Sequence, residues 1–156
     1  MSKPAAEPYE AARLRPADLS DTARLVVLYN LARPEAAPET AASMADWLEH
    51  GGALLLETPD ARALCALRWR ETDEGWRVDR IATLPEARSQ GYGRWLMTKV
   101  EALAIRANIP TLNLQLEDAR PELSQYYERM GYRVVGGDGG AVTLNKRVGG
   151  TWQTKR

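Results

Sequence analysis

One stretch of the chain, Arg80 to Gly93, constrains the fold most, and it reads R-I-A-T-L-P-E-A-R-S-Q-G-Y-G. The β-branched and alternating residues 78–83 predict a half-buried strand. Pro85 ends this strand, because proline has no N–H to donate to a neighbouring strand. Gly91 and Gly93 follow. The next residues carry an apolar pattern of helical spacing, made of Leu96, Val100, Leu103, Ala104 and Ala107. A strand, a glycine-bearing turn and a helix N-terminus together direct unpaired N–H groups to one place, which suits a phosphate.

Two common phosphate-binding motifs do not fit this turn. A P-loop ends in Gly-Lys-Ser/Thr, whereas Gly93 is followed by an arginine, and a dinucleotide fingerprint has a third glycine where this chain has a leucine. What remains is Arg88-x-x-Gly91-x-Gly93, preceded by Pro85. This string resembles the pyrophosphate-binding motif of the GNAT superfamily, the acyl-CoA-dependent N-acyltransferases.

A second segment, residues 126–132, reads Y-Y-E-R-M-G-Y. It resembles the superfamily's aromatic-Tyr-Glu-x-x-Gly-Phe/Tyr segment, in which a helix ends at glycine and the next strand begins with an aromatic residue. The two segments lie at the family's usual separation. The resemblance covers nearly the whole chain, from about Arg13 to about Arg147.

Composition sets the broad class. The 156 residues suit one domain, and because 21 basic side chains match 21 acidic ones, no basic field indicates a nucleic acid partner. One cysteine, Cys65, excludes an internal disulfide and suits a reducing cytoplasm. No signal peptide and no membrane span is expected. We predict a cytoplasmic protein with a flexible tail over residues 1–10, a GNAT-like domain over 11–148 and a tail over 149–156.

The remaining patterns predict an α/β fold. In the first helix, Leu19, Ala23, Val26, Val27 and Leu31 fall on one face. A second helix stops at Gly51-Gly52, and Pro121 and Gly131 bound the last one. The expected strands are residues 11–15, 53–57, 62–70, 78–83, 111–116, 132–135 and 141–147, with a turn at 136–140. This order, and the resemblance, imply a single mixed, mostly antiparallel sheet with helices on both faces. In the family, acyl-CoA lies where two strands of the sheet splay apart.

The resemblance implies acetyl-CoA as co-substrate, with no metal. The resemblance implies that the pyrophosphate is bound by backbone N–H groups of Arg88, Ser89, Gln90, Gly91, Tyr92 and Gly93. Ser89 departs from the family's usual glycine. The resemblance also implies that main-chain groups of Thr83, with its neighbours Ala82 and Leu84, bind the thioester carbonyl and the pantetheine arm. Arg120 stands where many relatives have an asparagine that touches the pantetheine, so we assign it to the cofactor's phosphates, with an acidic acceptor or solvent as alternatives.

Two residues are candidates for proton transfer. Tyr127 matches the family's tyrosine that protonates the departing thiolate, the alternative being a core tyrosine. Asp79 stands four residues before Thr83, on the same strand face, where several relatives carry a carboxylate base; a salt bridge with Arg77 is the alternative. His50, the one histidine, reads as a helix C-terminal residue. No cluster has metal-ligand spacing, and Cys65 reads as a small core residue.

The sequence therefore predicts an enzyme that moves acetyl from acetyl-CoA to a primary amine by direct attack in a ternary complex. The alternative is a non-catalytic acyl-CoA-binding regulatory module. The acceptor is a small molecule or a peptide, shaped in this family by residues such as 31–38 and 136–140, which carry no signature of one substrate class. We expect a monomer or homodimer without nucleic acid or membrane partners.

Overall fold

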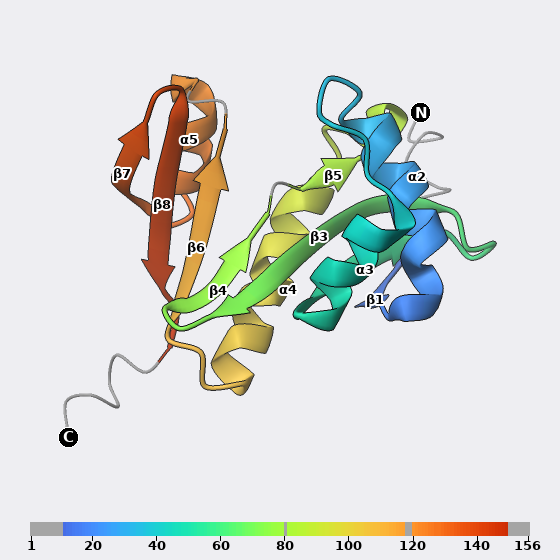
Figure 1. Ribbon diagram of the computed structural model, residues 1–156, viewed down its shortest axis with the longest axis horizontal. Helices are drawn as coiled ribbons and strands as arrows, with labels where there is room; N and C mark the ends of the chain where they lie inside the picture. Colours follow the sequence, from blue (N-terminus) through green and yellow to red (C-terminus); the bar gives the residue numbers. More distant parts are fainter. Residues whose placement is uncertain (1–10, 80, 118–119, 150–156) are drawn as a thin grey trace. The chain divides into compact units, whose positions relative to one another are not determined.

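The computed structural model describes residues 11–79, 81–117 and 120–149. Strand β1 comes first, helices α2 and α3 follow, then four strands, helix α4, a strand, helix α5 and two last strands (Figure 1). The strands are β1 (Arg13–Pro16), β2 (Gly51–Glu57), β3 (Ala63–Thr72), β4 (Gly75–Val78), β5 (Ala82–Thr83), β6 (Thr111–Leu116), β7 (Arg133–Asp138) and β8 (Ala141–Arg147). The helices are α2 (Thr22–Ala32), α3 (Ala41–Glu49), α4 (Tyr92–Arg106) and α5 (Pro121–Glu128), with short 3₁₀ turns η1 (Leu19–Asp21) and η2 (Pro85–Ala87).

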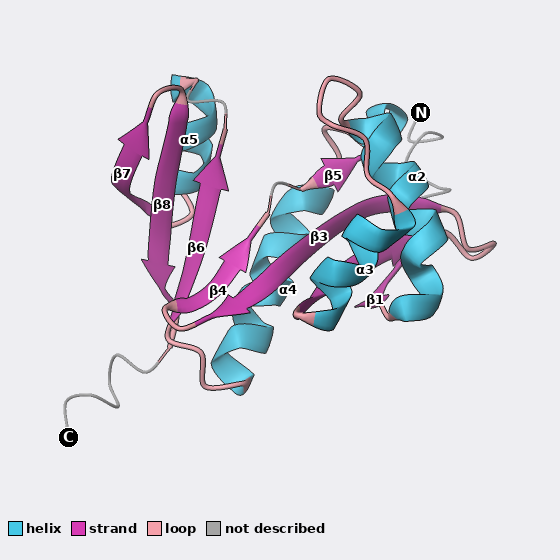
Figure 2. Ribbon diagram, in the orientation of Figure 1, coloured by secondary structure: helices cyan, strands magenta, loops and turns pink. Residues whose placement is uncertain are grey.

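The strands form one mixed sheet (Figure 2). Their order is β1-β2-β3-β4-β6-β8-β7, and β5 pairs with β3 beside this path. The β4–β6 pair is parallel, whereas the β1–β2, β3–β4, β3–β5, β6–β8 and β7–β8 pairs are antiparallel. The predicted fold class, an α/β fold on a single mostly antiparallel sheet, is confirmed.

The chain divides into two compact units. The first contains the described residues up to 68 together with 81–98, and the second contains 69–79 together with the described residues from 99 onward. The tail predicted over 1–10 lies outside the described residues, as does the tail over 149–156 except Gly149, whose N–H donates to Pro110 O at 3.3 Å. The single domain over 11–148 stays a prediction. No helix in the described ranges has the length and apolar character to cross a membrane.

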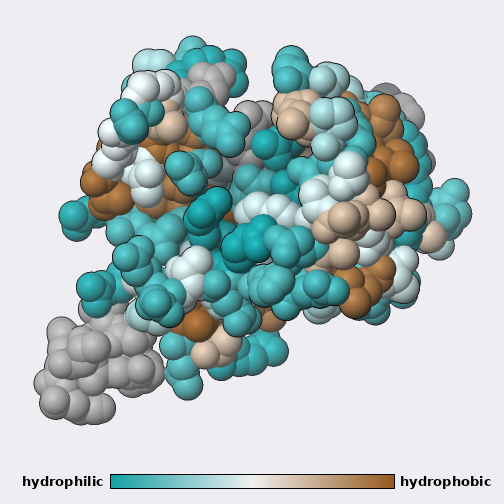
Figure 3. Space-filling model, in the orientation of Figure 1, coloured by the Kyte–Doolittle hydropathy of each residue, from teal (hydrophilic) through white to brown (hydrophobic). Residues whose placement is uncertain are grey.

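In the first unit, helix α2 is apolar on more than one side. Its inward side carries Leu25 and Leu28, which are almost completely buried. The sequence predicted a buried face through Leu19, Val27 and Leu31, and this prediction is wrong, because these three side chains are more than half exposed. Both sides show helical spacing, so the apolar pattern alone does not choose between them. Figure 3 shows the resulting apolar surface, in brown at the right, over α2.

Helix α3 begins as predicted and ends earlier than predicted. Thr40 caps its first turn, accepting from Ser43 N, while the Ser43 side chain accepts from Thr40 N. His50 is the C-cap residue, as the sequence indicated. Gly51, expected to stop the helix, instead begins β2, because the chain turns directly from His50 into the sheet.

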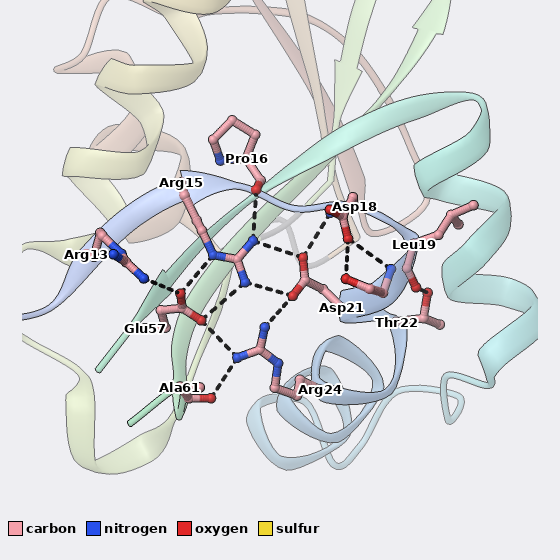
Figure 4. A network of polar contacts seen from close by, with 11 residues as sticks. Arg13, Arg15, Pro16, Asp18, Leu19, Asp21, Thr22, Arg24, Glu57 and Ala61 are labelled. Carbon is pink, nitrogen blue, oxygen red and sulfur yellow. Dashed lines mark hydrogen bonds and ion pairs between the residues drawn. The ribbon is translucent and has the colours of Figure 1, made fainter. Parts of the chain in front are cut away.

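Two carboxylates and three arginines form a charged network in the first unit (Figure 4). Asp21 and Glu57 are 1% and 3% exposed. Arg15 donates to both, with Nη2 2.8 Å from Asp21 Oδ1 and Nε 2.8 Å from Glu57 Oε2. Arg24 donates to the same two carboxylates, and Arg13 lies 3.6 Å from Glu57. Hydrogen bonds from Arg15 favour the ionised forms, so the pKa of Asp21 falls to about 2 and the pKa of Glu57 lies below its usual range.

The strand predicted over residues 78–83 is two strands, so that prediction is corrected. Val78 ends β4 opposite Trp69, and Ala82 begins β5 opposite Ala66. Four steps along the chain from Val78 to Ala82 therefore correspond to three steps along β3, from Trp69 to Ala66. The pairing described for β3 is therefore interrupted between Val78 and Ala82.

The second unit follows the sequence more closely. Strand β6 has the predicted bounds, and its alternating leucines are buried. Helix α5 begins at Pro121 as predicted, and Gly131, at φ +99°, ends the turn that follows it. The turn predicted over 136–140 is shorter, because β7 continues to Asp138 and pairs there with Ala141.

Candidate active site

The predicted phosphate loop joins a 3₁₀ turn to helix α4. Pro85 occupies the first position of η2, and the exposed residues Arg88 to Gln90 follow. Ser89 and Gly91 have left-handed backbones, at φ +64° and +83°. Gly91 O accepts from Trp95 N at 3.1 Å, so Gly91 is the N-cap residue of α4, and the amides of the first turn have no intrahelical acceptor. The loop therefore provides a helix N-terminus with backbone donors, the arrangement that a pyrophosphate requires.

Arg88 has a structural partner that the sequence did not indicate. Its Nη2 donates to Ala32 O at 3.0 Å, and Ala32 is the last residue of α2. A cation at the C-terminal carbonyls of a helix is favourable, because these carbonyls carry the negative end of the helix dipole. Arg88 therefore fastens the phosphate loop to the end of α2.

Strand β5 presents the main chain of Thr83 away from β3. Leu84 N donates to Leu64 O at 2.9 Å, and Cys65 lies opposite Thr83. In an antiparallel ladder, hydrogen-bonded and non-hydrogen-bonded pairs alternate. Because Leu84 and Leu64 form a hydrogen-bonded pair, the Thr83–Cys65 pair is non-hydrogen-bonded, and the N–H and C=O of Thr83 point to the opposite edge of β5. Within the described ranges β5 pairs only with β3, so that edge has no strand on it.

The side chains of Thr83 and Leu84 lie on opposite faces of β5. Thr83 Oγ1 lies 3.2 Å from Cys65 Sγ, and Cys65 is fully buried, as the sequence predicted for a core residue. Burial raises the pKa of the Cys65 thiol to about 11, so this thiol is a poor nucleophile. Leu84 lines an apolar groove of about 350 Å³ beside α2, with Val27 and Leu31. Ala82 is buried in β5.

In the second unit, Tyr127 and Arg120 both belong to α5. Tyr127 is 4% exposed and lies on the buried side of the helix. Arg120 is the N-cap residue, and its side chain makes no capping hydrogen bond, since an extended guanidinium cannot act as acceptor. Tyr126 is half-buried, and its ring packs edge-on against Tyr127, with centroids 5.1 Å apart.

The structure adds three residues around Tyr127 that the sequence reasoning missed. Tyr132 packs edge-on against Tyr127, with ring centroids 6.1 Å apart, and its hydroxyl donates to Glu101 at 2.8 Å. Lys146 Nζ lies 3.1 Å from the same carboxylate. One signal was available in the sequence. Lys146 stands two residues after Leu144 in β8, so its side chain lies on the same face of the strand as the buried Leu144.

Asp79 does not occupy the strand position that the sequence argument required. It follows β4, is half-buried, and lies in the interruption before β5. The argument that Asp79 and Thr83 share one face of a continuous strand therefore fails, because β4 ends at Val78 and β5 begins only at Ala82. The role of Asp79 as base stays a prediction.

The predicted site residues thus fall into two sets, each described within its own unit. Ala82 to Gly93 form one continuous segment of the first unit, and Asp79, Arg120 and Tyr127 belong to the second. His50 lies in the first unit, is exposed and accepts or donates only locally, at Asp46. Among the described residues, no group of three or more His, Cys, Asp or Glu side chains is placed to hold a metal ion.

The fold resembles those of solved acetyltransferases. The ribosomal-protein-S18-alanine N-acetyltransferase of Escherichia coli superposes with a TM-score of 0.76 at 15% identity, covering 88% of this chain and 94% of that one. The PaiA N-acetyltransferase of Thermoplasma acidophilum, solved with coenzyme A, gives 0.74 at 13% identity over 87% and 98%. A phosphinothricin acetyltransferase of Sinorhizobium meliloti, solved with AcCoA, gives 0.71 at 16% identity over 90% of each chain.

Sequence comparison identifies the family. A search of curated protein sequences found no significant match. The family model described as an acetyltransferase (GNAT) domain matches residues 49–134, a range that contains the phosphate loop, strand β5 and Tyr127. Because this match spans more than half of the sequence, the chain belongs to the GNAT acetyltransferase family and is an acyl-CoA-dependent N-acetyltransferase.

Proposed function

We propose that this protein transfers acetyl from acetyl-CoA to the primary amine of a small molecule or peptide, by direct attack in a ternary complex. The observation that carries the proposal is the loop after Pro85, where two left-handed residues lead into the N-terminus of α4. Two of the solved acetyltransferases named above are named for their acceptors, an alanine of ribosomal protein S18 and phosphinothricin, so a protein and a small molecule are both represented among proteins of this fold.

Most of the proposed cofactor contacts belong to the first unit. The amides of Gly91, Tyr92 and Gly93 bind the pyrophosphate, with Arg88, Ser89 and Gln90 around it. The N–H and C=O of Thr83, which point away from β3, bind the pantetheine arm and the thioester carbonyl, flanked by Ala82 and Leu84. Arg120, a cation, contacts the phosphates of the cofactor. The buried thiol of Cys65 suits the reducing cytoplasm in which we expect the enzyme to work.

The chemistry requires two proton transfers. The amine nitrogen attacks the thioester carbonyl, a C–N bond forms, the C–S bond breaks, and the amine proton passes to Asp79. Tyr127 donates to the departing thiolate. A thiol has a pKa near ~8.5 and a phenol near ~10, so full proton transfer is uphill by about 2 kcal/mol. Tyr127 therefore acts chiefly as a hydrogen-bond donor to the sulfur.

The test is thiol release from acetyl-CoA against a panel of polyamines, amino acids and peptides with free N-termini. With the fastest acceptor, Tyr127→Phe is expected to lower kcat by roughly 10²-fold while acetyl-CoA affinity stays within twofold, because the hydroxyl meets charge only as the thiolate forms. Tyr126→Phe is the matched control, expected to be nearly neutral. Full turnover by Tyr127→Phe would show that Tyr127 is a core residue only.

A further inference from the structure

The hydroxyl of Tyr132 is held inside the second unit by two charged side chains. Tyr132 is 2% exposed, and its hydroxyl donates to Glu101 Oε2 at 2.8 Å. Lys146 Nζ donates to Glu101 Oε1 at 3.1 Å and to Met130 O at 2.8 Å, and lies 5.6 Å from the centre of the Tyr132 ring. Burial first, and then the charge of Glu101, raises the pKa of Tyr132, so its hydroxyl stays protonated and acts as the donor.

The chain makes room for this cluster at a specific cost. Gly131 has φ +99°, and a Cβ there would lie 3.1 Å from Lys146 Cε. A side chain at this position would therefore both strain the backbone and press on the lysine. A phenylalanine in place of Tyr132 would fill the same apolar volume with no need for a half-buried carboxylate or lysine beside it. Glu101, Gly131 and Lys146 together therefore hold the ring of Tyr132 in one position.

That ring in turn fixes Tyr127. The two rings meet edge to face, at 6.1 Å between centroids and 78° between planes, and Tyr132 N donates to Tyr127 O at 3.1 Å. Tyr126 contacts Tyr127 at 5.1 Å and 82°. The two ring contacts therefore restrict the rotation of the Tyr127 side chain, and the ring of Tyr132 is itself held in place through its hydroxyl, which donates to Glu101 in the ion pair with Lys146.

We infer that Tyr132, fixed by Glu101 and Lys146, is a positioning residue that holds the Tyr127 phenol in the orientation needed to donate to the departing thiolate. This inference rests on the proposed role of Tyr127. Hydrogen bonding to the sulfur requires correct placement of the phenol oxygen at the moment the C–S bond breaks, and small displacements of a reacting group are costly in rate. Freeing the ring of Tyr132 lowers the fraction of molecules in which that placement is met.

The test uses Tyr132→Phe and Glu101→Gln in the full chain, with the fastest amine from the acceptor panel. With acetyl-CoA, each variant is expected to lose about tenfold in kcat, while the KM for acetyl-CoA stays within about twofold. With the acetyl thioester of an aromatic thiol, a more acidic leaving group that needs less assistance, the loss should shrink to about twofold. In a Tyr127→Phe background, Tyr132→Phe should cost less than about twofold more, because both act through one hydroxyl.

Leu114→Val serves as a control for loss of stability, since Leu114 is buried in β6 opposite Leu144 and makes none of the contacts above. It should lower the melting temperature without changing the preference between the two thioesters. If Tyr132→Phe does not fold, Lys146→Met removes the charge, keeps an unbranched side chain, and is expected to show the same leaving-group pattern at a smaller size.

The possible results separate the two ideas. Equal losses with both thioesters, or losses that add to that of Tyr127→Phe, would make the cluster purely structural and overturn the inference. A large effect of Tyr127→Phe with none from Tyr132→Phe or Glu101→Gln would do the same, and would leave the proposed role of Tyr127 intact. No effect of Tyr127→Phe would instead remove the proposed role, and the inference with it.

Discussion

Ser89 adopts a backbone conformation that serine rarely takes, φ +64°, in the loop before α4. Left-handed backbone costs a residue with a Cβ roughly 1 kcal/mol or more. We expect Ser89→Gly to leave the free energy of unfolding unchanged or to raise it by up to about 1 kcal/mol, since the strain relieved offsets the greater freedom of glycine in the unfolded chain. Urea unfolding measures this change.

Gly91 provides the matched comparison in the same loop. It has φ +83°, and a Cβ placed on it would meet no atom within 4 Å, so only backbone strain opposes a substitution. Gly91→Ala should therefore lower the free energy of unfolding by about 1 kcal/mol, in the opposite direction from Ser89→Gly. Equal losses for both variants would show that Ser89 is held by contacts rather than strained.

For single residues, the sequence predicted the backbone role of prolines and glycines better than it predicted the hydrogen-bond partners of side chains. Pro85 and Gly91 have the roles that their residue types indicated, because proline and glycine restrict or extend the backbone wherever they occur. Gly131 was expected to end α5, and this prediction is wrong, because the C-cap residue is Arg129. The bond from Arg88 to Ala32 O could not be predicted, since 56 residues separate the two and no local pattern encodes which carbonyl an arginine meets.

Among the elements, α2 and the phosphate loop are joined through Arg88. Its guanidinium caps the α2 carbonyl at Ala32, so Arg88→Ala should lower the free energy of unfolding by about 1 kcal/mol even without cofactor. Arg94→Ala, which removes an exposed cation from the first turn of α4, is the control and should not destabilise, because a cation is unfavourable at a helix N-terminus. Thermal unfolding of the two apo variants makes the comparison. An equal melting temperature for Arg88→Ala and the unaltered protein would contradict the capping role.

Elements with one apolar face were predictable, and elements with two were not. Strand β6 alternates leucine with polar residues, and its bounds and buried face match the prediction. Helix α2 is apolar on two sides, so spacing did not identify the side that packs. The break between β4 and β5 was also missed, because its cause is the register against β3, which the local sequence does not contain. For the same reason the strand position assigned to Asp79 was wrong.

For the whole molecule, the network of Asp21 and Glu57 predicts how stability depends on acid. The pKa of Asp21 is about 2 in the folded chain and ~3.9 in an unfolded one, so its ionised form stabilises the fold above pH ~4. That contribution, about 2.6 kcal/mol, is lost as the pH falls from ~4 toward 2. Glu57 acts in the same direction, because its pKa is also lowered.

Asp21→Asn tests this dependence. The variant should lose about 3 kcal/mol at pH 7, because two arginines lose a buried anionic partner, and its stability should fall less steeply between pH 4 and 2.5. Chemical denaturation at a series of pH values gives both quantities. Asp73→Asn, in an exposed turn, is the control and should follow the unaltered protein at every pH. An unchanged acid slope in Asp21→Asn would mean that other groups govern acid unfolding.

Ligand binding gives a second measurement on the whole molecule. We expect acetyl-CoA to bind the folded state alone, so that a hundredfold excess over its Kd stabilises the fold by ~2.7 kcal/mol. NAD and ATP at the same concentrations should raise the melting temperature much less, because the loop lacks the third glycine of one motif and the lysine of the other. An equal rise in melting temperature with ATP would show that the loop binds the nucleotide part common to both ligands and does not distinguish acetyl-CoA.

The charged network also limits how the sequence can drift over evolutionary time. Arg15 and Arg24 each bond both Asp21 and Glu57, so a neutral residue in place of either buried carboxylate removes an anionic partner from both arginines at once. We therefore expect substitutions at these four positions to be tolerated when they occur together or in compensating pairs. Grafting α2 from another acetyltransferase onto this scaffold would fail unless the donor's partners on β1 and β2 travelled with it.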